Sequence, residues 1–353
     1  MNGDRIKAFL FSVTLAILPA GAGAQGFAGL GADATGFAFP DRDVQIEFPR
    51  DHGPHPDFRI EWWYLTANLQ AADGTGYGLQ WTLFRSAGAP VEKEGWSSPQ
   101  VWMGHSAVTT PDRHFVAERL ARGGIGQAGA EAEPFQAWID DWEMRATGAG
   151  IDALSMRATG PDFAYDMTLS AQGPLVFHGE NGYSVKSASG RASYYYSQPF
   201  YEIAGTLQLP GGDVAVTGSA WLDREWASQP LGDTQISWDW FSMAFDDGAR
   251  LMGFTLHDTA EGDYTAATWI DPDGTTTAYA DGAFNARPLE TEEVAGREVP
   301  VVWQVSLPDR AVDVTVTAMN RQAWMDTLVS YWEGPVRITG SHTGRGYLEM
   351  TGY

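Results

Sequence analysis

The sequence of 353 residues contains no cysteine, which excludes disulfide bonds, thiolate metal sites and cysteine nucleophiles. Basic residues are scarce: 22 Lys and Arg against 45 Asp and Glu give a formal net charge of −23. Such a chain repels phosphate backbones, so nucleic acid is not an expected partner. Motifs for a nucleophile elbow, a phosphate loop or a dinucleotide site are also missing, and we expect no metal and no organic cofactor.

Long apolar runs are missing beyond the start of the chain. Arg5 and Lys7 precede an apolar stretch at 8–20, and small residues follow at 22–24. The stretch is shorter than the roughly 20 residues that cross a bilayer, so we predict that residues 1–24 are a signal peptide cleaved after Ala24. An uncleaved N-terminal anchor is the alternative. Cleavage would leave a periplasmic or secreted protein with no integral membrane segment.

Long helical patterns are missing as well. Frequent Gly, at 41 residues, and frequent aromatic residues, at 13%, are typical of short strands joined by turns. Two hairpin strands are expected, one from Ile60 and one at 78–84; on the first, Trp63 should lie on one face and Trp62 on the other. Further strands are expected at 101–109, 135–146, 151–158, 163–171, 193–196, 201–209, 214–221, 250–256, 264–270, 299–306 and 311–318, and short helices at 117–121 and 319–328.

The second half of the chain repeats features of the first. Segment 62–74 resembles segment 238–248, each an aromatic strand that ends in Asp-Gly and leads into a second strand. The segments that close the two halves also match. This pattern predicts two similar β domains in tandem, at 46–228 and 229–353, after a linker at 25–45. The alternative is that aromatic hairpins recur by chance.

The segment LDREW at 222–226 carries the densest charge among aromatic residues. On a strand, Asp223 and Glu225 point to one side, and Leu222, Arg224 and Trp226 to the other. Two carboxylates about 7 Å apart could form an acid–base pair if burial separated their pKa values. The alternative is a structural ion network in which Arg224 keeps the carboxylates ionised.

Isolated polar residues among apolar ones are further candidates for proton transfer: Glu61, His105 and Asp239. Each could instead be a core polar group with satisfied hydrogen bonds. The segment DHGPHPD at 51–57 holds two His and two Asp, which are ligands for zinc or iron. Its prolines prevent a helix, however, and we favour a polar loop that closes one barrel mouth.

Aromatic residues recur along the expected strands. Because neighbours on a strand point to opposite faces, up to half of these rings should face a barrel interior. A cavity lined by them would suit an apolar, extended or polycyclic ligand and could stabilise a carbocation, whereas ordinary barrel core is the alternative. The candidate ligand-binding residues are Trp62, Tyr64, Trp81, Tyr195, Trp226, Trp238 and Trp240.

Five motifs together resemble one known family. They are RDHGPHPDFRIEWWY at 50–64, ASYYYSQP at 192–199, GSAWLDREWASQPL at 218–231, WDWFSMAFDDG at 238–248 and YWEGPVRITGSHTGRGYLEMTGY at 331–353. The chain resembles the AttH-type and CrtC (carotenoid 1,2-hydratase-like) lipocalin-like family over nearly the whole mature sequence. The resemblance implies an all-β fold of two tandem lipocalin-like antiparallel β-barrels packed together.

The resemblance leaves two functions open. AttH-type members are exported proteins associated with ABC-type export systems, which implies binding of a hydrophobic, lipid or isoprenoid-like molecule beside an ABC transporter. The predicted signal peptide favours this first function. CrtC-type members add water to a carbon–carbon double bond of acyclic carotenoids, which implies a cofactor-free hydratase, or hydro-lyase, acting by acid catalysis. Its implied proton donors are Glu61, His105, Asp223, Glu225 and Asp239, and its implied cation stabilisers are Trp62, Tyr64 and Trp240.

Overall fold

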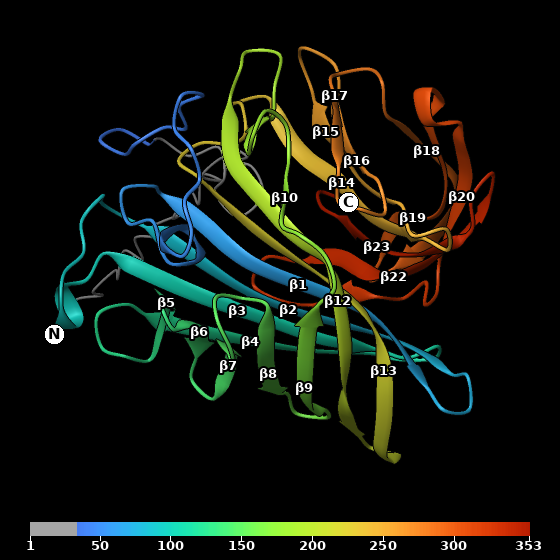
Figure 1. The fold of residues 1–353 in the computed structure, drawn as a ribbon, viewed down its shortest axis with the longest axis horizontal. Helices are drawn as coiled ribbons and strands as arrows, with labels where there is room; N and C mark the ends of the chain where they lie inside the picture. Colours follow the sequence, from blue (N-terminus) through green and yellow to red (C-terminus); the bar gives the residue numbers. More distant parts are fainter. Residues whose placement is uncertain (1–33) are drawn as a thin grey trace, which may run out of the picture.

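The computed structural model describes residues 34–353, so the predicted signal peptide lies outside the described residues. Within this range the chain forms two antiparallel sheets, one of 13 strands and one of 10, with only short 3-10 helices besides (Figure 1). The first sheet curls into a nearly closed barrel and the second into a half barrel, packed against it. The all-β prediction of two packed barrels is confirmed.

In each sheet the first strand pairs with both the next strand and the last one: β1 with β2 and β13, and β14 with β15 and β23. The matched segments 62–74 and 238–248 therefore begin the two sheets at equivalent positions. The first sheet comprises β1 (Ile60–Ala71), β2 (Gly76–Ala87), β3 (Gln100–Thr109), β4 (His114–Arg122), β5 (Ala128–Ala132), β6 (Phe135–Ile139), β7 (Trp142–Ala146), β8 (Ala153–Thr159), β9 (Ala164–Ala171), β10 (Val176–Phe177), β11 (Tyr183–Val185), β12 (Ala192–Leu209) and β13 (Gly212–Ala227). The second comprises β14 (Gln235–Phe245), β15 (Arg250–Asp258), β16 (Tyr264–Ile270), β17 (Thr276–Tyr279), β18 (Asn285–Val294), β19 (Arg297–Leu307), β20 (Val312–Ala318), β21 (Trp324–Met325), β22 (Tyr331–Gly340) and β23 (Gly344–Met350). The 3-10 helices are η2 (Arg50–His52), η3 (Gly95–Ser97) and η4 (Pro308–Arg310).

The two expected helices are wrong. Residues 117–121 belong to β4, where Ala117 and Ala121 are buried on one face and the backbone pairs with β3. Residues 319–328 form turns and the short strand β21, because the Met319 amide donates to the Pro335 carbonyl and β21 pairs with β22. In both segments, pairing with a neighbouring strand overrides a short local preference for helix.

Two strand boundaries also differ from the expectation. The expected strand 135–146 is a hairpin of β6 and β7, because Asp140 takes a φ of 53° at the turn. The expected strands 193–196 and 201–209 are one strand, β12, with a register shift between Gln198 and Tyr201. The shift bends β12, which pairs with β10 and β11 at its start and with β9 at its end.

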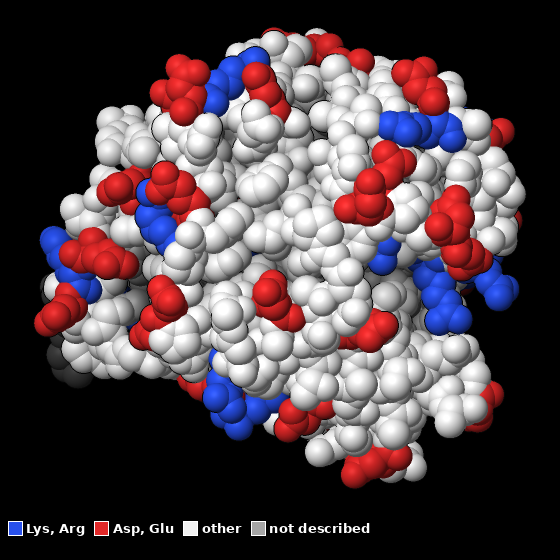
Figure 2. All heavy atoms as spheres, viewed as in Figure 1, with Lys and Arg blue, Asp and Glu red and all other residues white. Residues whose placement is uncertain are grey.

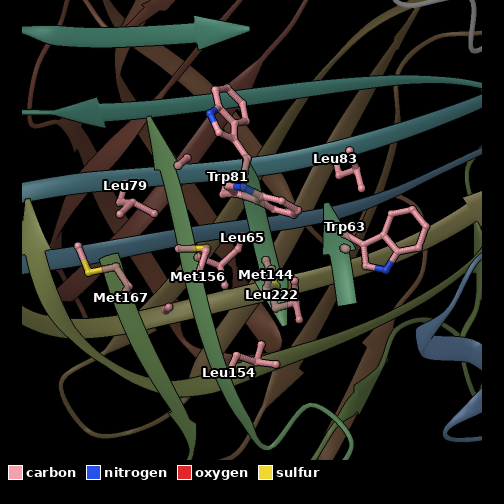
Figure 3. Packing of buried hydrophobic residues seen from close by; sticks show 14 of the residues in the cluster. Trp63, Leu65, Leu79, Trp81, Leu83, Met144, Leu154, Met156, Met167 and Leu222 are labelled. Carbon is pink, nitrogen blue, oxygen red and sulfur yellow. The ribbon is translucent and has the colours of Figure 1, made fainter. Parts of the chain in front are cut away.

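Side chains alternate along β1 as predicted. Trp63 and Leu65 point into the first barrel, where they pack against Trp81 and against side chains from β7, β8 and β9 (Figure 3). Trp62 and Tyr64 lie on the opposite face, in an apolar cluster shared with the second sheet. A separate apolar cluster fills the second barrel.

The described part of the predicted linker is largely exposed but is hydrogen-bonded to the rest of the protein at two residues. The Asp41 amide donates to the Tyr194 hydroxyl at 2.8 Å, and the Ser228 hydroxyl donates to the Ala38 carbonyl. The domain boundaries proposed above stay a prediction, although the chain passes from the first sheet to the second between β13 and β14. Across 34–353 we find no helix long and apolar enough to span a bilayer.

Acidic side chains are spread over the molecular surface. Figure 2 shows them in separate groups across the viewed face, several with a Lys or Arg alongside. Arg321, for example, pairs with Glu290 and Glu292. The negative charge is therefore not collected into a single patch on this face, and exposed pairs of this kind add little to stability.

Glu61 is the centre of a buried ion network at one end of the first barrel. Its carboxylate is bonded to the guanidinium groups of Arg85 and Arg224, the latter at 3.0 Å, and to the His55 ring at 2.9 Å. Burial by itself would raise the pKa of Glu61. The charge of Arg85 and the hydrogen bond from His55 outweigh it and hold that pKa well below its usual range.

The segment 51–57 is tied to this network. Arg224 donates to the Gly53 carbonyl at 2.6 Å, and the Trp63 indole donates to the His52 carbonyl at 3.0 Å. Burial lowers the pKa of His52 to about 4, so its ring is neutral at physiological pH. These bonds make the segment a polar loop built into the end of the barrel, as favoured from the sequence.

We predict that Arg224→Met destabilises the protein strongly, because Glu61 would keep its burial and lose one of its two guanidinium partners. The expected cost is about 3–5 kcal/mol in the free energy of unfolding, measured by urea denaturation. Arg145→Met is the matched control, since Arg145 is largely exposed beside Glu143, and it should cost less than about 1 kcal/mol. Equal costs for the two variants would contradict a structural role for the network.

Candidate functional site

A cavity of about 270 Å³ lies between the two sheets, on the outward face of β1 and β13 and against β14 and β15. Most of its wall is apolar, and the polar groups are few. Five of the aromatic residues predicted to bind a ligand line it: Trp62, Tyr64, Tyr195, Trp238 and Trp240. The sequence did not single out four further lining residues: Phe84, Phe254, Leu256 and Tyr331.

The expected location of the cavity is corrected by the structure. The aromatic rings were expected to line a barrel interior, but the interior of each barrel is filled by an apolar cluster. Trp81 and Trp226 belong to the cluster of the first barrel and do not line the cavity. The reason is that β1 and residues 220–227 of β13 are buried on both faces, so alternation alone does not tell the core face from the cavity face.

Asp223 enters the cavity wall from β13. It is buried, and it accepts hydrogen bonds from the Trp221 indole, at 2.7 Å, and from the Ser197 hydroxyl. Burial raises the pKa of Asp223 to about 7, because these neutral donors compensate only part of the lost hydration. A carboxyl group that can hold a proton near neutral pH therefore faces an apolar cavity.

Glu349 enters the same cavity from β23 and was missed in the sequence. It accepts a hydrogen bond from the Trp238 indole at 2.7 Å, and burial raises its pKa to about 7. Its cross-strand partner on β22 is Glu333. The sequence feature that could have identified Glu349 is a pair of carboxyl groups opposite each other in otherwise apolar strands. Recognising that pair requires knowing that β22 pairs with β23.

Glu225 is the third acid of the cavity wall, and it is paired with a cation. Lys186 lies 3.1 Å from its carboxylate, and the same ammonium group lies over the rings of Tyr195 and Phe254, at 4.8 and 4.4 Å from their centroids. Asp223 and Glu225 therefore share one face of β13 as predicted. The expected partner Arg224 points to the other face and binds Glu61 instead.

The three isolated polar candidates have different positions. Glu61 reaches the cavity wall, but its two guanidinium partners keep it ionised, so it is a poor proton donor. His105 lies behind the wall, bonded to the Tyr331 hydroxyl at 3.0 Å. Asp239 is bonded to His257 at 2.8 Å and does not line the cavity; this bond raises the pKa of His257 to about 9.

Candidate metal ligands are not grouped in this structure. Between residues 34 and 353, no three His, Cys, Asp or Glu side chains are arranged to hold a metal ion. The chemistry that the cavity wall offers is that of neutral carboxylic acids beside aromatic rings. Such groups can donate a proton to a carbon–carbon double bond, or a hydrogen bond to a polar atom of an otherwise apolar molecule.

Comparisons with known proteins agree with this architecture. A family model described as AttH-like matches residues 40–353. The crystal structure of an AttH protein from Nitrosomonas europaea is 32% identical, with a TM-score of 0.81, and the match covers 90% of this chain and 99% of that one. No curated protein matches the chain in sequence.

Two more distant structures share the fold. Kievitone hydratase from Nectria haematococca is 13% identical, with a TM-score of 0.68 over 90% of this chain and 98% of that one. CghA, solved with Sch210972, is 12% identical, with a TM-score of 0.51 over 83% and 88%. At these identities the likeness concerns the fold alone.

We predict that the cavity acids make the protein less stable as pH rises. Asp223 and Glu349 have pKa values of about 7 in the folded protein, above those of Asp and Glu in the unfolded chain. Between about pH 4.5 and 7.5 the folded state therefore binds more protons than the unfolded state. The free energy of unfolding falls as pH rises across that window. Asp223→Asn and Glu349→Gln should each reduce this loss, by roughly 2–4 kcal/mol. The measurement is urea unfolding at several pH values.

The control for this prediction is Glu202→Gln, which removes an exposed carboxylate on β12. Its pH dependence of stability should match that of the wild type. If Asp223→Asn and Glu349→Gln behaved like this control, neither acid would hold a proton in the folded protein near neutral pH.

Proposed function

The chain belongs to the AttH-like family, and we propose that the cavity between its two barrels binds a hydrophobic small molecule. The observation that carries the proposal is an apolar cavity of about 270 Å³ walled by aromatic rings from both sheets. Ligand pockets in proteins are typically about 300–1,000 Å³, mostly apolar, with a few polar groups that fix orientation. The cavity is close to the lower end of that range.

The chemistry of the wall favours a lipid or isoprenoid-like ligand. Trp62, Trp238 and Trp240 offer flat apolar surfaces, and few charged groups are available to bind an ionic ligand. The charge of Lys186 is already matched by Glu225 at 3.1 Å. An extended or ring-containing hydrocarbon skeleton would therefore gain most from burial here.

We further propose that the protein is exported and works beside an ABC-type export system. The support for export is the pattern of residues 1–24, which predicts a signal peptide cleaved after Ala24. The support for the transporter is the resemblance to AttH-type proteins. A small molecule that partitions into membranes would need such a carrier between a transporter and its destination.

We predict that filling the cavity weakens binding of a neutral hydrophobic probe. Val329, on the loop between β21 and β22, lines the cavity, so Val329→Trp should place an indole in the space and weaken binding of N-phenyl-1-naphthylamine at least about tenfold. Probe fluorescence provides the measurement. Val91→Trp is the matched control, because Val91 is exposed and lies away from the cavity wall. Unchanged affinity in Val329→Trp would rule out this cavity as the binding site.

A second candidate function, hydration of an isoprenoid double bond, is favoured by one observation. Asp223 and Glu349 both face the cavity with pKa values raised to about 7. One neutral carboxylic acid would give its proton to an alkene carbon, leaving a carboxylate and a carbocation. The faces of Tyr64 and Trp240 would stabilise the cation until water attacks it, and the oxygen would then return a proton to a carboxylate.

We predict that Asp223→Asn lowers any such hydration by about 10²–10⁴-fold, the usual contribution of a proton donor. The assay is incorporation of labelled water oxygen into an acyclic isoprenoid such as geraniol, followed by mass spectrometry. Asp239→Asn is the control, since Asp239 is buried outside the cavity wall, and it should retain the rate. A folded Asp239→Asn protein as inactive as Asp223→Asn would contradict the assignment.

A further inference from the structure

The cavity wall contains one row of side chains that crosses the first sheet from strand to strand. Strands β4, β3, β2 and β1 lie side by side in that order, followed by β13 and β12 (Figure 1). Residues directly opposite each other on neighbouring strands point to the same face of a sheet. The pairing registers align six cavity-lining residues, one from each strand: Tyr195, Glu225, Trp62, Phe84, Met103 and Leu120. At about 4.8 Å per strand, this row spans roughly 19 Å from Glu225 to Leu120.

The two ends of the row differ in their access to solvent. Glu225, on β13, is buried, with 6% of its surface exposed, and its neighbour Tyr195 is buried as well. Leu120, on β4, is 52% exposed, and β4 is the edge strand of the first sheet. The side chains between these ends are partly buried. The cavity is therefore closed over β12 and β13 and open over β4.

The closed end carries the ion pair of Lys186 and Glu225. Lys186 follows β11, and its position is fixed by the Gln235 side-chain amide, which donates to the Lys186 carbonyl at 2.8 Å. The ammonium group lies 3.1 Å from the Glu225 carboxylate. An ammonium group has three hydrogens, and a carboxylate can accept several hydrogen bonds. The pair can therefore offer a ligand both a donor and an acceptor while its net charge is zero.

A hydroxyl group matches this pair better than a charged group does. The hydroxyl oxygen can accept from Lys186 while its hydrogen is donated to Glu225. An anionic group would be repelled by Glu225, and a cationic group by Lys186. The hydroxyl group of Tyr64, in the same wall, is already directed to Glu333 at 2.5 Å.

The open end is lined by exposed apolar side chains. Val101, Leu120 and Leu328 all line the cavity, and more than half of each is exposed. Leu328 is held beside β4, because its amide donates to the Glu118 side chain at 2.9 Å. Single exposed apolar residues are common, but a group of them at one opening is typical of a place where an apolar molecule binds.

We infer that the ligand is a long single-chain alcohol, with its hydroxyl group between Lys186 and Glu225 and its hydrocarbon chain across β1, β2 and β3. The end of the chain lies at the opening and covers Leu120. This inference rests on the proposed function and narrows its ligand to a neutral amphiphile. It also assigns the position of each end: the polar group is at the closed end, and the tail is at the edge of the sheet.

The position of the hydroxyl group is tested with farnesol and farnesene, which share a skeleton and differ in the hydroxyl group. Their Kd values are measured by displacement of N-phenyl-1-naphthylamine. In the double variant Lys186→Met/Glu225→Gln, the ratio of the farnesene Kd to the farnesol Kd should fall at least about tenfold. The reason is that the hydrogen bonds to two charged groups are lost and the apolar contacts remain. Using the ratio cancels the difference in hydration between the two molecules, and the double change leaves neither charge unpaired.

The position of the tail is tested separately with geraniol and with geranylgeraniol, which is twice as long. Leu120→Asn should weaken binding of geranylgeraniol about three- to tenfold, because the end of its chain loses an apolar neighbour. Binding of geraniol should not change, since the shorter chain ends before β4. Leu289→Asn is the matched control, because Leu289 is an exposed leucine outside the cavity wall, and it should leave both Kd values unchanged.

The outcomes separate this inference from the function on which it rests. An unchanged ratio in a folded Lys186→Met/Glu225→Gln protein would overturn the inference. Equal losses for geraniol and geranylgeraniol in Leu120→Asn would also overturn it, and this exposed variant keeps the inference testable if the buried double variant does not fold. Failure of the wild-type protein to bind N-phenyl-1-naphthylamine would instead overturn the proposed function itself.

Discussion

The antiparallel pairing of β1 with β13 is the constraint on which the rest of the structure depends, because residues 220–227 of β13 and their partners on β1 are buried on both faces. On one face Glu61 and Arg224 form the ion network that closes the end of the first barrel. On the other face Tyr64 and Asp223 form part of the cavity wall. Since neighbours on a strand point to opposite sides, most residues of the pair face either the barrel or the cavity, and Glu61, at the barrel end, also reaches the cavity wall.

Buried carboxyl groups in this protein are held in two opposite states by their surroundings. Glu61 has guanidinium partners and remains ionised, whereas Asp223 and Glu349 are surrounded by indole and hydroxyl donors and hold a proton near neutral pH. Burial acts in the same direction on all three, and the difference is the presence of a cation within bonding distance. The barrel end therefore gains rigidity, and the cavity gains acids that can donate hydrogen.

Much of this arrangement was accessible before the structure. The alternation in LDREW correctly placed Asp223 and Glu225 on one face of β13, and the repeated aromatic hairpins correctly indicated two sheets. The cavity was nevertheless expected inside a barrel, and one of the two interpretations of LDREW paired Arg224 with its sequence neighbours Asp223 and Glu225. Both errors have one cause: a period of two separates the faces of a strand but does not say which neighbour covers each face.

The sequence by itself determined the class of fold, the faces of the strands and the chemical character of the residues that line the cavity. Only the tertiary structure decided that the cavity lies between the barrels, that Glu349 joins Asp223 there, and that His105 lies behind the wall. These contacts join strands from the two sheets, such as β1 with β22. The separation of Tyr64 from Glu333 along the chain is so large that no local pattern records their contact, and it arises only when two complete sheets pack together.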